Sequence, residues 1–139
     1  MKTELKIQND LAEIERLANR IRSFGREHEL PDVFVWEIRL VLEEIVTNII
    51  SYGYEDQKSH TIEVSIANEN EDIVLAVRDD ACPFNLLEHP EPDMDIPIEE
   101  REIGGMGIHL VREIMDEIEY SREADQNMVV MRRRKKGNH

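Results

Sequence analysis

Polar and apolar residues first alternate along this chain and then recur at helical spacing. The alternation over residues 3–7 predicts a short strand. A helix should follow, with Asn9 or Asp10 as its cap and an end near Gly25. Its apolar residues share one face, which predicts burial of that face; they are Leu11, Ile14, Leu17, Ala18 and Ile21.

A second helix is predicted from Pro31, in its first turn, to about Tyr52. Apolar residues occur on most of its sides, which indicates a central rather than a peripheral position. After a polar loop, alternation returns at 61–67 and again at 73–77. The polar turn between these two segments predicts a β-hairpin.

The rest of the chain combines a long irregular segment with a helix and a pair of strands. Residues 80–103 contain most of the prolines and little periodicity, and a loop of that length is usually functional or disordered. A helix over 106–118 should follow, then strands near 119–122 and 128–133 around a turn at 123–127. The order βααββαββ predicts an α+β fold, a two-layer sandwich with helices on one face of a largely antiparallel sheet.

Length and composition suit one globular domain over residues 1–139, with 40% hydrophobic and 35% charged residues. The formal net charge of −14 disfavours binding to nucleic acid or to an anionic membrane. The sequence offers no apolar run long enough for a transmembrane helix and no signal-peptide core, so we expect a cytoplasmic protein. Cys82 is the single cysteine, which excludes an intramolecular disulfide and a cysteine-cluster metal site.

The segment from Gly104 to Val111 is the most informative part of the chain. Gly104, Gly105 and Gly107 stand where an apolar helical pattern begins. Glycines let backbone N–H groups approach an anion closely, and a helix N-terminus adds a favourable dipole. The segment therefore fits a phosphate site, with a simple tight turn as the alternative. In so acidic a chain, a bound polyphosphate would also require a divalent cation.

A carboxylate and an amide share one face of the second predicted helix. Glu44 and Asn48 are four residues apart, beside the apolar Val41 and Ile45. Polar groups in such surroundings are costly unless they have partners, so they either face solvent or serve a function. In the functional interpretation, Asn48 coordinates Mg²⁺ and Glu44 accepts a proton from an attacking hydroxyl group. Glu43 points about 100° away and is expected on the surface.

An acidic pair follows the apolar strand at 73–77. Asp79 and Asp80 could simply close the strand in a turn. Alternatively, a carboxylate at the end of a buried strand can accept a hydrogen bond from an exocyclic amine, such as N6 of adenine.

Together these segments resemble the Bergerat-fold (GHKL) ATP-binding superfamily. Its pattern combines a helix with Glu-x-x-x-Asn, a strand that ends in Asp-x-Gly-x-Pro-Phe, and a lid that ends in Gly-x-Gly before a helix. The small stand-alone anti-sigma factor serine/threonine kinases are similar to this chain nearly end to end. The similar segments are 44–48, 52–54, 79–84, 100–111, 115–116 and 127–131.

The resemblance implies roles for individual residues. Asn48 would bind Mg²⁺, Glu44 would be the catalytic base, and Asp79 would recognise adenine. Arg101, in the lid, could reach the terminal phosphate. The other residues expected at the nucleotide are Ala81, Gly104, Gly105, Met106, Gly107 and Ile108.

Two positions depart from the family's pattern. Ala81 stands where a glycine is expected, and Tyr52 stands where the family has a histidine. The methyl group of Ala81 would either crowd the adenine or stiffen the turn. Neither departure removes a ligand atom, so both bear on nucleotide affinity more than on nucleotide identity.

The resemblance implies an ATP- and Mg²⁺-dependent kinase that phosphorylates a serine or threonine of a STAS-type antagonist protein. In that family the same chain also sequesters a sigma factor or another regulatory protein, and assembly as a homodimer is left open. The alternative is a nucleotide-gated binding module without kinase activity, in which ATP orders the acidic segment 88–103. Glu44 favours the kinase, whereas Ala81 and the acidic segment favour the module.

Overall fold

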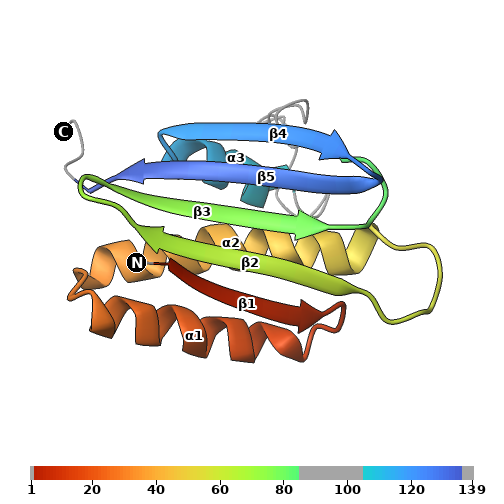
Figure 1. Cartoon of the computed structure of the whole chain (residues 1–139), viewed down its shortest axis with the longest axis horizontal. Coiled ribbons are helices and arrows are strands. Elements are labelled where there is room, and N and C mark those ends of the chain that lie inside the picture. The colour runs from red at the N-terminus through yellow and green to blue at the C-terminus, as the bar shows by residue number, and fades with distance from the viewer. Residues whose placement is uncertain (1, 85–104, 136–139) are drawn as a thin grey trace.

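The computed structural model describes residues 2–84 and 105–135. In these residues a five-stranded antiparallel sheet forms one layer and three helices form the other (Figure 1). Along the chain the elements are β1 (Lys2–Gln8), α1 (Glu13–Glu27), α2 (Asp32–Tyr52), β2 (Thr61–Asn68), β3 (Asp72–Asp79), α3 (Gly105–Ile114), β4 (Glu117–Glu123) and β5 (Gln126–Arg134).

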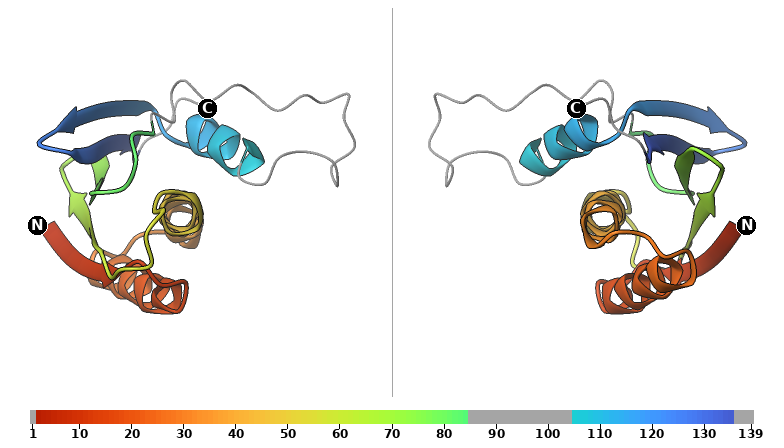
Figure 2. Two further views of the ribbon diagram at one scale, coloured as in Figure 1. Left: turned by 90° about the vertical axis from the view of Figure 1, so that its right-hand side faces the viewer. Right: turned by 90° about the vertical axis from the view of Figure 1, so that its left-hand side faces the viewer.

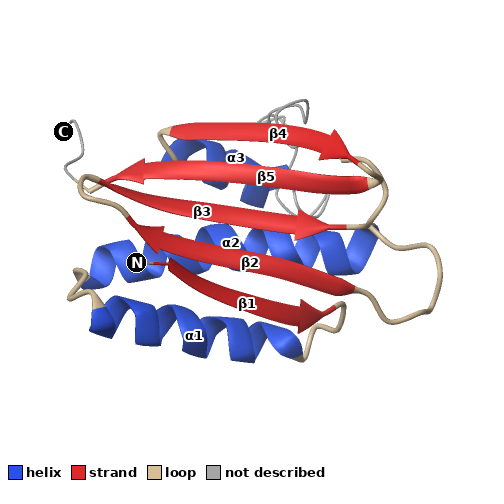
Figure 3. Ribbon diagram, viewed as in Figure 1, coloured by secondary structure: helices blue, strands red, loops and turns tan. Residues whose placement is uncertain are grey.

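The element order and the layers confirm the predicted α+β two-layer sandwich. The strands lie in the order β1-β2-β3-β5-β4, and each neighbouring pair is antiparallel (Figure 3). All three helices cover the same face of the sheet (Figure 2). None of the described helices is long and apolar enough to cross a membrane.

The core lies between the sheet and the helices because every second strand residue points to the helical layer. Inward residues of β2 and β3 are buried in one cluster with residues of α1 and α2. Burial of each such side chain contributes about 1.5–3 kcal/mol relative to exposure. The largest contributors include Ile62, Ile66, Ile73, Leu75, Leu17, Ile21, Phe24, Val41, Leu42 and Val46.

Helix α2 is central, as its apolar pattern predicts. It packs against both α1 and α3 and lies between them (Figure 2). Three of its large hydrophobic residues nevertheless remain exposed, Val33 at 59%, Trp36 at 60% and Tyr52 at 59%. Trp36 lies about 200° around the helix from the buried Ile38, and some exposed apolar residues are common on protein surfaces.

The ends of two helices differ from the sequence-based prediction. Helix α1 begins only at Glu13, because the Asp10 side chain accepts the N–H of Ala12 in a turn before the helix. It then continues past Gly25 to Glu27. Helix α3 ends at Ile114 rather than at residue 118, because the backbone N–H of Asp116 bonds to the carbonyl of Arg132 and the chain joins the sheet.

The turn between β4 and β5 is tighter than the predicted turn at 123–127. Only Ala124 and Asp125 lie outside the strands, and both have positive φ angles, 52° and 62°. Such angles at both central residues are typical of a two-residue hairpin, although its usual Asn-Gly signal is missing here. Asn127 therefore belongs to β5, where it is the partner of Asp79 in the β3–β5 register.

Candidate nucleotide-binding site

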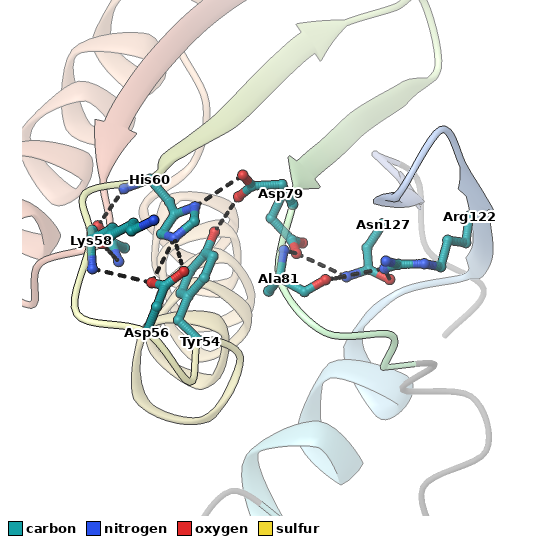
Figure 4. Close-up of polar contacts among 10 residues, drawn as sticks. Tyr54, Asp56, Lys58, His60, Asp79, Ala81, Arg122 and Asn127 are labelled. Atoms are coloured by element: carbon teal, nitrogen blue, oxygen red, sulfur yellow. Dashed lines mark hydrogen bonds and ion pairs between the residues drawn. The ribbon is translucent and has the colours of Figure 1, made fainter.

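Asp79 lies at the end of β3 and is buried, with only 4% of the residue's surface exposed. Strand alternation turns it to the helical side of the sheet, like Leu75 and Val77 before it. Its Oδ1 atom accepts hydrogen bonds from the N–H of Ala81 and from Nδ2 of Asn127, both at 2.9 Å (Figure 4). Burial raises the pKa of the Asp79 carboxyl group, while these two bonds oppose the rise.

Asn127 connects this carboxylate to the following turn and to β4. Besides its bond to Asp79, its Nδ2 atom donates to the carbonyls of Ala81 at 3.3 Å and Cys82 at 3.0 Å. Its Oδ1 atom accepts from Nη1 of Arg122 at 3.0 Å and from the hydroxyl group of Tyr120. Sequence reasoning missed this role, because only the register of β3 and β5 brings Asn127 to Asp79.

The methyl group of Ala81 packs against the end of α2. Ala81 is buried, and a Cβ atom built on Gly53 would lie only 2.7 Å from the Cβ of Ala81. The N–H of Cys82 also bonds to the carbonyl of Gly53 at 2.9 Å. The turn after β3 thus packs on Gly53, and the methyl group of Ala81 fits there because glycine has no side chain.

Glu44 and Asn48 share one face of α2, as their spacing predicts. Nδ2 of Asn48 donates to Oε1 of Glu44 at 3.2 Å, so this bond does not use the amide oxygen that a cation would bind. Counted from Gly53, Asn48 lies about 7–8 Å and Glu44 about 13–14 Å along the helix axis. Glu43 is bonded to Nε of Arg39 at 2.9 Å and is half-buried rather than fully on the surface.

The predicted phosphate segment is described only from Gly105 onward. Gly105 begins α3 and Gly107 lies in its first turn, in line with the predicted helix start. Arg101 and Gly104 lie outside the described residues, as does the acidic segment 88–103. The expected contacts of Met106 and Ile108 with the nucleotide remain predictions.

A polar cluster lies on the other side of the same strand end. Asp80 accepts a bond from the Tyr54 hydroxyl group at 3.0 Å and lies 3.0 Å from Nδ1 of His60, while Asp56 lies 2.8 Å from Nε2 of the same ring (Figure 4). The rings of Tyr54 and His60 stack with their centroids 4.2 Å apart.

The contacts of this cluster shift the pKa values of two of its members. Hydrogen bonds to Asp80 and Asp56 raise the pKa of His60. Burial, with the bond to Asp80, raises the pKa of Tyr54. A polar pocket of about 400 Å³ opens beside this cluster.

Residues 7–133 match the family of histidine kinase-like ATPase domains. Because this match covers most of the chain, the chain belongs to that family, which confirms the resemblance to Bergerat-fold ATP-binding proteins. An ATPase domain also agrees with the prediction that this chain binds ATP.

The chain is also similar in sequence to anti-sigma F factors of Bacillus species. The anti-sigma F factor of Bacillus licheniformis is 32% identical over 82 residues, which are 59% of this chain and 56% of the relative. The anti-sigma F factor of Bacillus thuringiensis strain Al Hakam is 36% identical over 84 residues, 60% of this chain and 57% of the relative. The matched part of the chain thus spans little more than half the length of these relatives.

A solved structure is similar in fold. The blue-light activated histidine kinase of Erythrobacter litoralis EL346 superposes with a TM-score of 0.53 and 17% sequence identity, over 74% of this chain and 31% of that one. At this identity the likeness concerns the fold alone.

Proposed function

We propose that this chain is a Mg²⁺-dependent, ATP-binding regulator that transfers the γ-phosphoryl group of ATP to a serine or threonine of a STAS-type antagonist protein. A sigma factor or another regulatory protein would be its second partner. The observation that carries the proposal is the bonded pair of Glu44 and Asn48 in the C-terminal half of α2, the helix whose end at Gly53 supports the turn after Asp79. Family membership and the similarity to anti-sigma F factors support it.

Asp79 would select the base. A buried carboxylate accepts a hydrogen bond from the N6 amine of adenine, but it would face the O6 acceptor of guanine. Two buried acceptors in contact cost roughly 1–3 kcal/mol or more, so ATP should bind more tightly than GTP.

Asn48 and the beginning of α3 would hold the phosphates. The amide oxygen of Asn48 is a suitable ligand for Mg²⁺, which would offset the negative charge of the phosphates in this acidic chain. Backbone N–H groups of Gly105 and Gly107, at the N-terminus of α3, would bind phosphate oxygens. Gly104, Met106, Ile108 and Ala81 would complete the nucleotide contacts, and Arg101 would reach the terminal phosphate.

Glu44 would act on the attacking hydroxyl group. Glu44 lies one helical turn farther than Asn48 from the end of α2 that is near Asp79. The adenine base, the phosphates and the acceptor hydroxyl group could therefore lie along α2 in that order. The hydroxyl oxygen of the antagonist would bond to the γ-phosphorus while the bond to the β–γ bridging oxygen breaks. Glu44 would take the hydroxyl proton.

The test compares ATP binding and phosphoryl transfer in the parent and in Glu44→Gln. The variant should bind ATP about as well as the parent, because glutamine keeps the size and the bond to Asn48. Transfer to a STAS-type antagonist should fall by roughly 10²–10⁴-fold, because the amide is not basic. Transfer is followed with ATP labelled in the γ-phosphoryl group.

The matched control is Glu43→Gln, which changes the neighbouring carboxylate bonded to Arg39 and should leave transfer close to the parent's. If transfer survives Glu44→Gln, another group is the base. If the parent binds ATP but phosphorylates no antagonist in a panel of STAS proteins, the nucleotide-gated binding module replaces the kinase.

A further inference from the structure

Asn127 is a buried amide whose two polar atoms both have partners. It is only 4% exposed because it occupies an inward-facing position of β5. The next inward-facing positions of this strand hold the apolar residues Val129 and Met131. A buried amide in a strand is costly unless its bonds are satisfied. Here the end of β3 supplies acceptors and β4 supplies donors.

These partners fix the direction of the amide. Nδ2 faces three acceptors, namely Oδ1 of Asp79 and the carbonyls of Ala81 and Cys82. On the other side, Oδ1 faces two donors, the Tyr120 hydroxyl group and Arg122 Nη1. A rotation of the amide by 180° would set its oxygen against three acceptors and its nitrogen against the donor-only guanidinium of Arg122, so the donor must point at Asp79.

The carboxylate of Asp79 is therefore held from two sides. Asn127 and the N–H of Ala81 both bond to Oδ1, and among the described residues no hydrogen bond engages Oδ2, so Oδ2 is the carboxylate oxygen that would meet the ligand. We infer that Asn127 is a positioning residue for base recognition, which orients Asp79 so that Oδ2 accepts the N6 amine of adenine. This inference rests on the proposed function and deepens it.

Asn127 also favours the ionised form of Asp79. Burial favours the protonated form of this carboxyl group, and the charge of Asp80, just after β3, acts in the same direction. The bonds from Asn127 and from the N–H of Ala81, and the charge of Arg122 on β4, oppose them. A protonated carboxyl group can donate a hydrogen bond to the O6 atom of guanine, so GTP would then also be able to bind. Loss of the Asn127 donor should therefore weaken selectivity most at low pH.

The experiment measures dissociation constants of the full chain for three nucleotides by calorimetry, between about pH 5.5 and pH 8. They are ATP, GTP and purine riboside triphosphate, which lacks the N6 amine. The parent should prefer ATP over the amine-free nucleotide by roughly tenfold or more, because the bond is made to a charged acceptor. In Asn127→Ala this preference should largely disappear, while affinity for the amine-free nucleotide stays close to the parent's.

Conservative variants separate positioning from a general role in the fold. Asn127→Ser keeps a donor that can reach toward Asp79 and should recover part of the preference. Tyr120→Phe removes one of the donors that orient the amide and should weaken the preference to a smaller extent, even if Asn127→Ala fails to fold. Asn68→Ala removes a half-buried amide that bonds to His28 instead, and should leave the preference unchanged.

The pH profile gives a second readout. The pH below which ATP is no longer preferred over GTP should rise in Asn127→Ala. The inference is overturned if Asn127→Ala weakens all three nucleotides equally, or if both the preference and its pH profile match the parent's. A parent that binds none of them contradicts the proposed function itself, and the inference with it.

Discussion

Asp79 and Asp80 are neighbours in sequence but lie on opposite sides of the end of β3. Asp79 is enclosed by donors from the following turn and from β5, and burial raises its pKa. For Asp80, burial acts in the same direction, but hydrogen bonds from His60 and Tyr54 outweigh it and lower the pKa. One side chain is thus suited to ligand recognition, and the other ties the α2–β2 loop to the strand.

The contact between Gly53 and Ala81 leaves no room for a side chain at position 53. In Gly53→Ala, the new Cβ atom would lie 2.6 Å from the carbonyl oxygen of Ile49 and 2.7 Å from the Cβ of Ala81. Such overpacking costs about 1–3 kcal/mol of unfolding free energy, which denaturant unfolding measures. Ala81→Gly alone should cost roughly 1 kcal/mol, from lost methyl burial and greater freedom of the unfolded chain.

The double variant tests whether this contact is the cause. Ala81→Gly removes one of the two clashes, so it should recover part of the stability that Gly53→Ala loses. Simple addition of the two single losses would show that the residues do not interact and would contradict the packing described for the turn.

Among the secondary-structure elements, the loop between α2 and β2 is held against the end of β3 by His60, which contacts Asp56 in the loop and Asp80 after the strand. Its ring lies between the carboxylates of Asp80 and Asp56 and stacks on Tyr54. Because the pKa of His60 is raised in the folded state, its contribution to stability is fully present below its unfolded pKa of about 6.5. The contribution is lost as pH rises through the folded pKa.

This linkage predicts a pH dependence that one histidine controls. The stability of the parent should fall as the pH rises above about 6.5, relative to that of His60→Gln, which lacks the titrating ring. Denaturant unfolding across this range measures the difference. His109→Gln serves as the control, because His109 pairs only with Glu113 of its own helix among the contacts described. An equal pH dependence in the parent and in His60→Gln would contradict the role of His60.

The sequence allowed the elements to be predicted in type and order, but not all of their ends. Periodicity located each helix and strand, because burial of one face leaves a regular apolar pattern. It failed near residue 118, where the apolar Ile118 suits either a helix or a strand and only the bond from Asp116 to β5 decides. It also made the turn at 123–127 too wide, because the positive φ angles that allow a two-residue turn at Ala124 and Asp125 have no glycine or asparagine to indicate them.

At the scale of the whole molecule, the two-layer arrangement brings separate motifs to one end. The C-terminal part of α2, the turn after β3 and the start of β5 meet there (Figure 1). Glu44, Asn48 and Asp79 could be selected from sequence because each belongs to a short local pattern. Asn127 and His60 could not, because their partners Asp79 and Asp80 are 48 and 20 residues away and only the sheet brings them together.

We propose above all that this end of the molecule binds ATP with Mg²⁺ through Asn48. The direct test is titration calorimetry of the parent with ATP, with and without Mg²⁺, and of Asn48→Ala under the same conditions. Asn19→Ala, which changes a surface asparagine bonded to Arg22 on α1, is the control and should behave like the parent.

The parent should bind ATP at least about tenfold more tightly with Mg²⁺ than without it, a difference of about 1.4 kcal/mol. Asn48→Ala should lose this advantage and bind Mg-ATP about as weakly as the parent binds metal-free ATP. Equal affinity of the parent with and without Mg²⁺, or an advantage from Mg²⁺ that survives in Asn48→Ala, would contradict the assignment of this site.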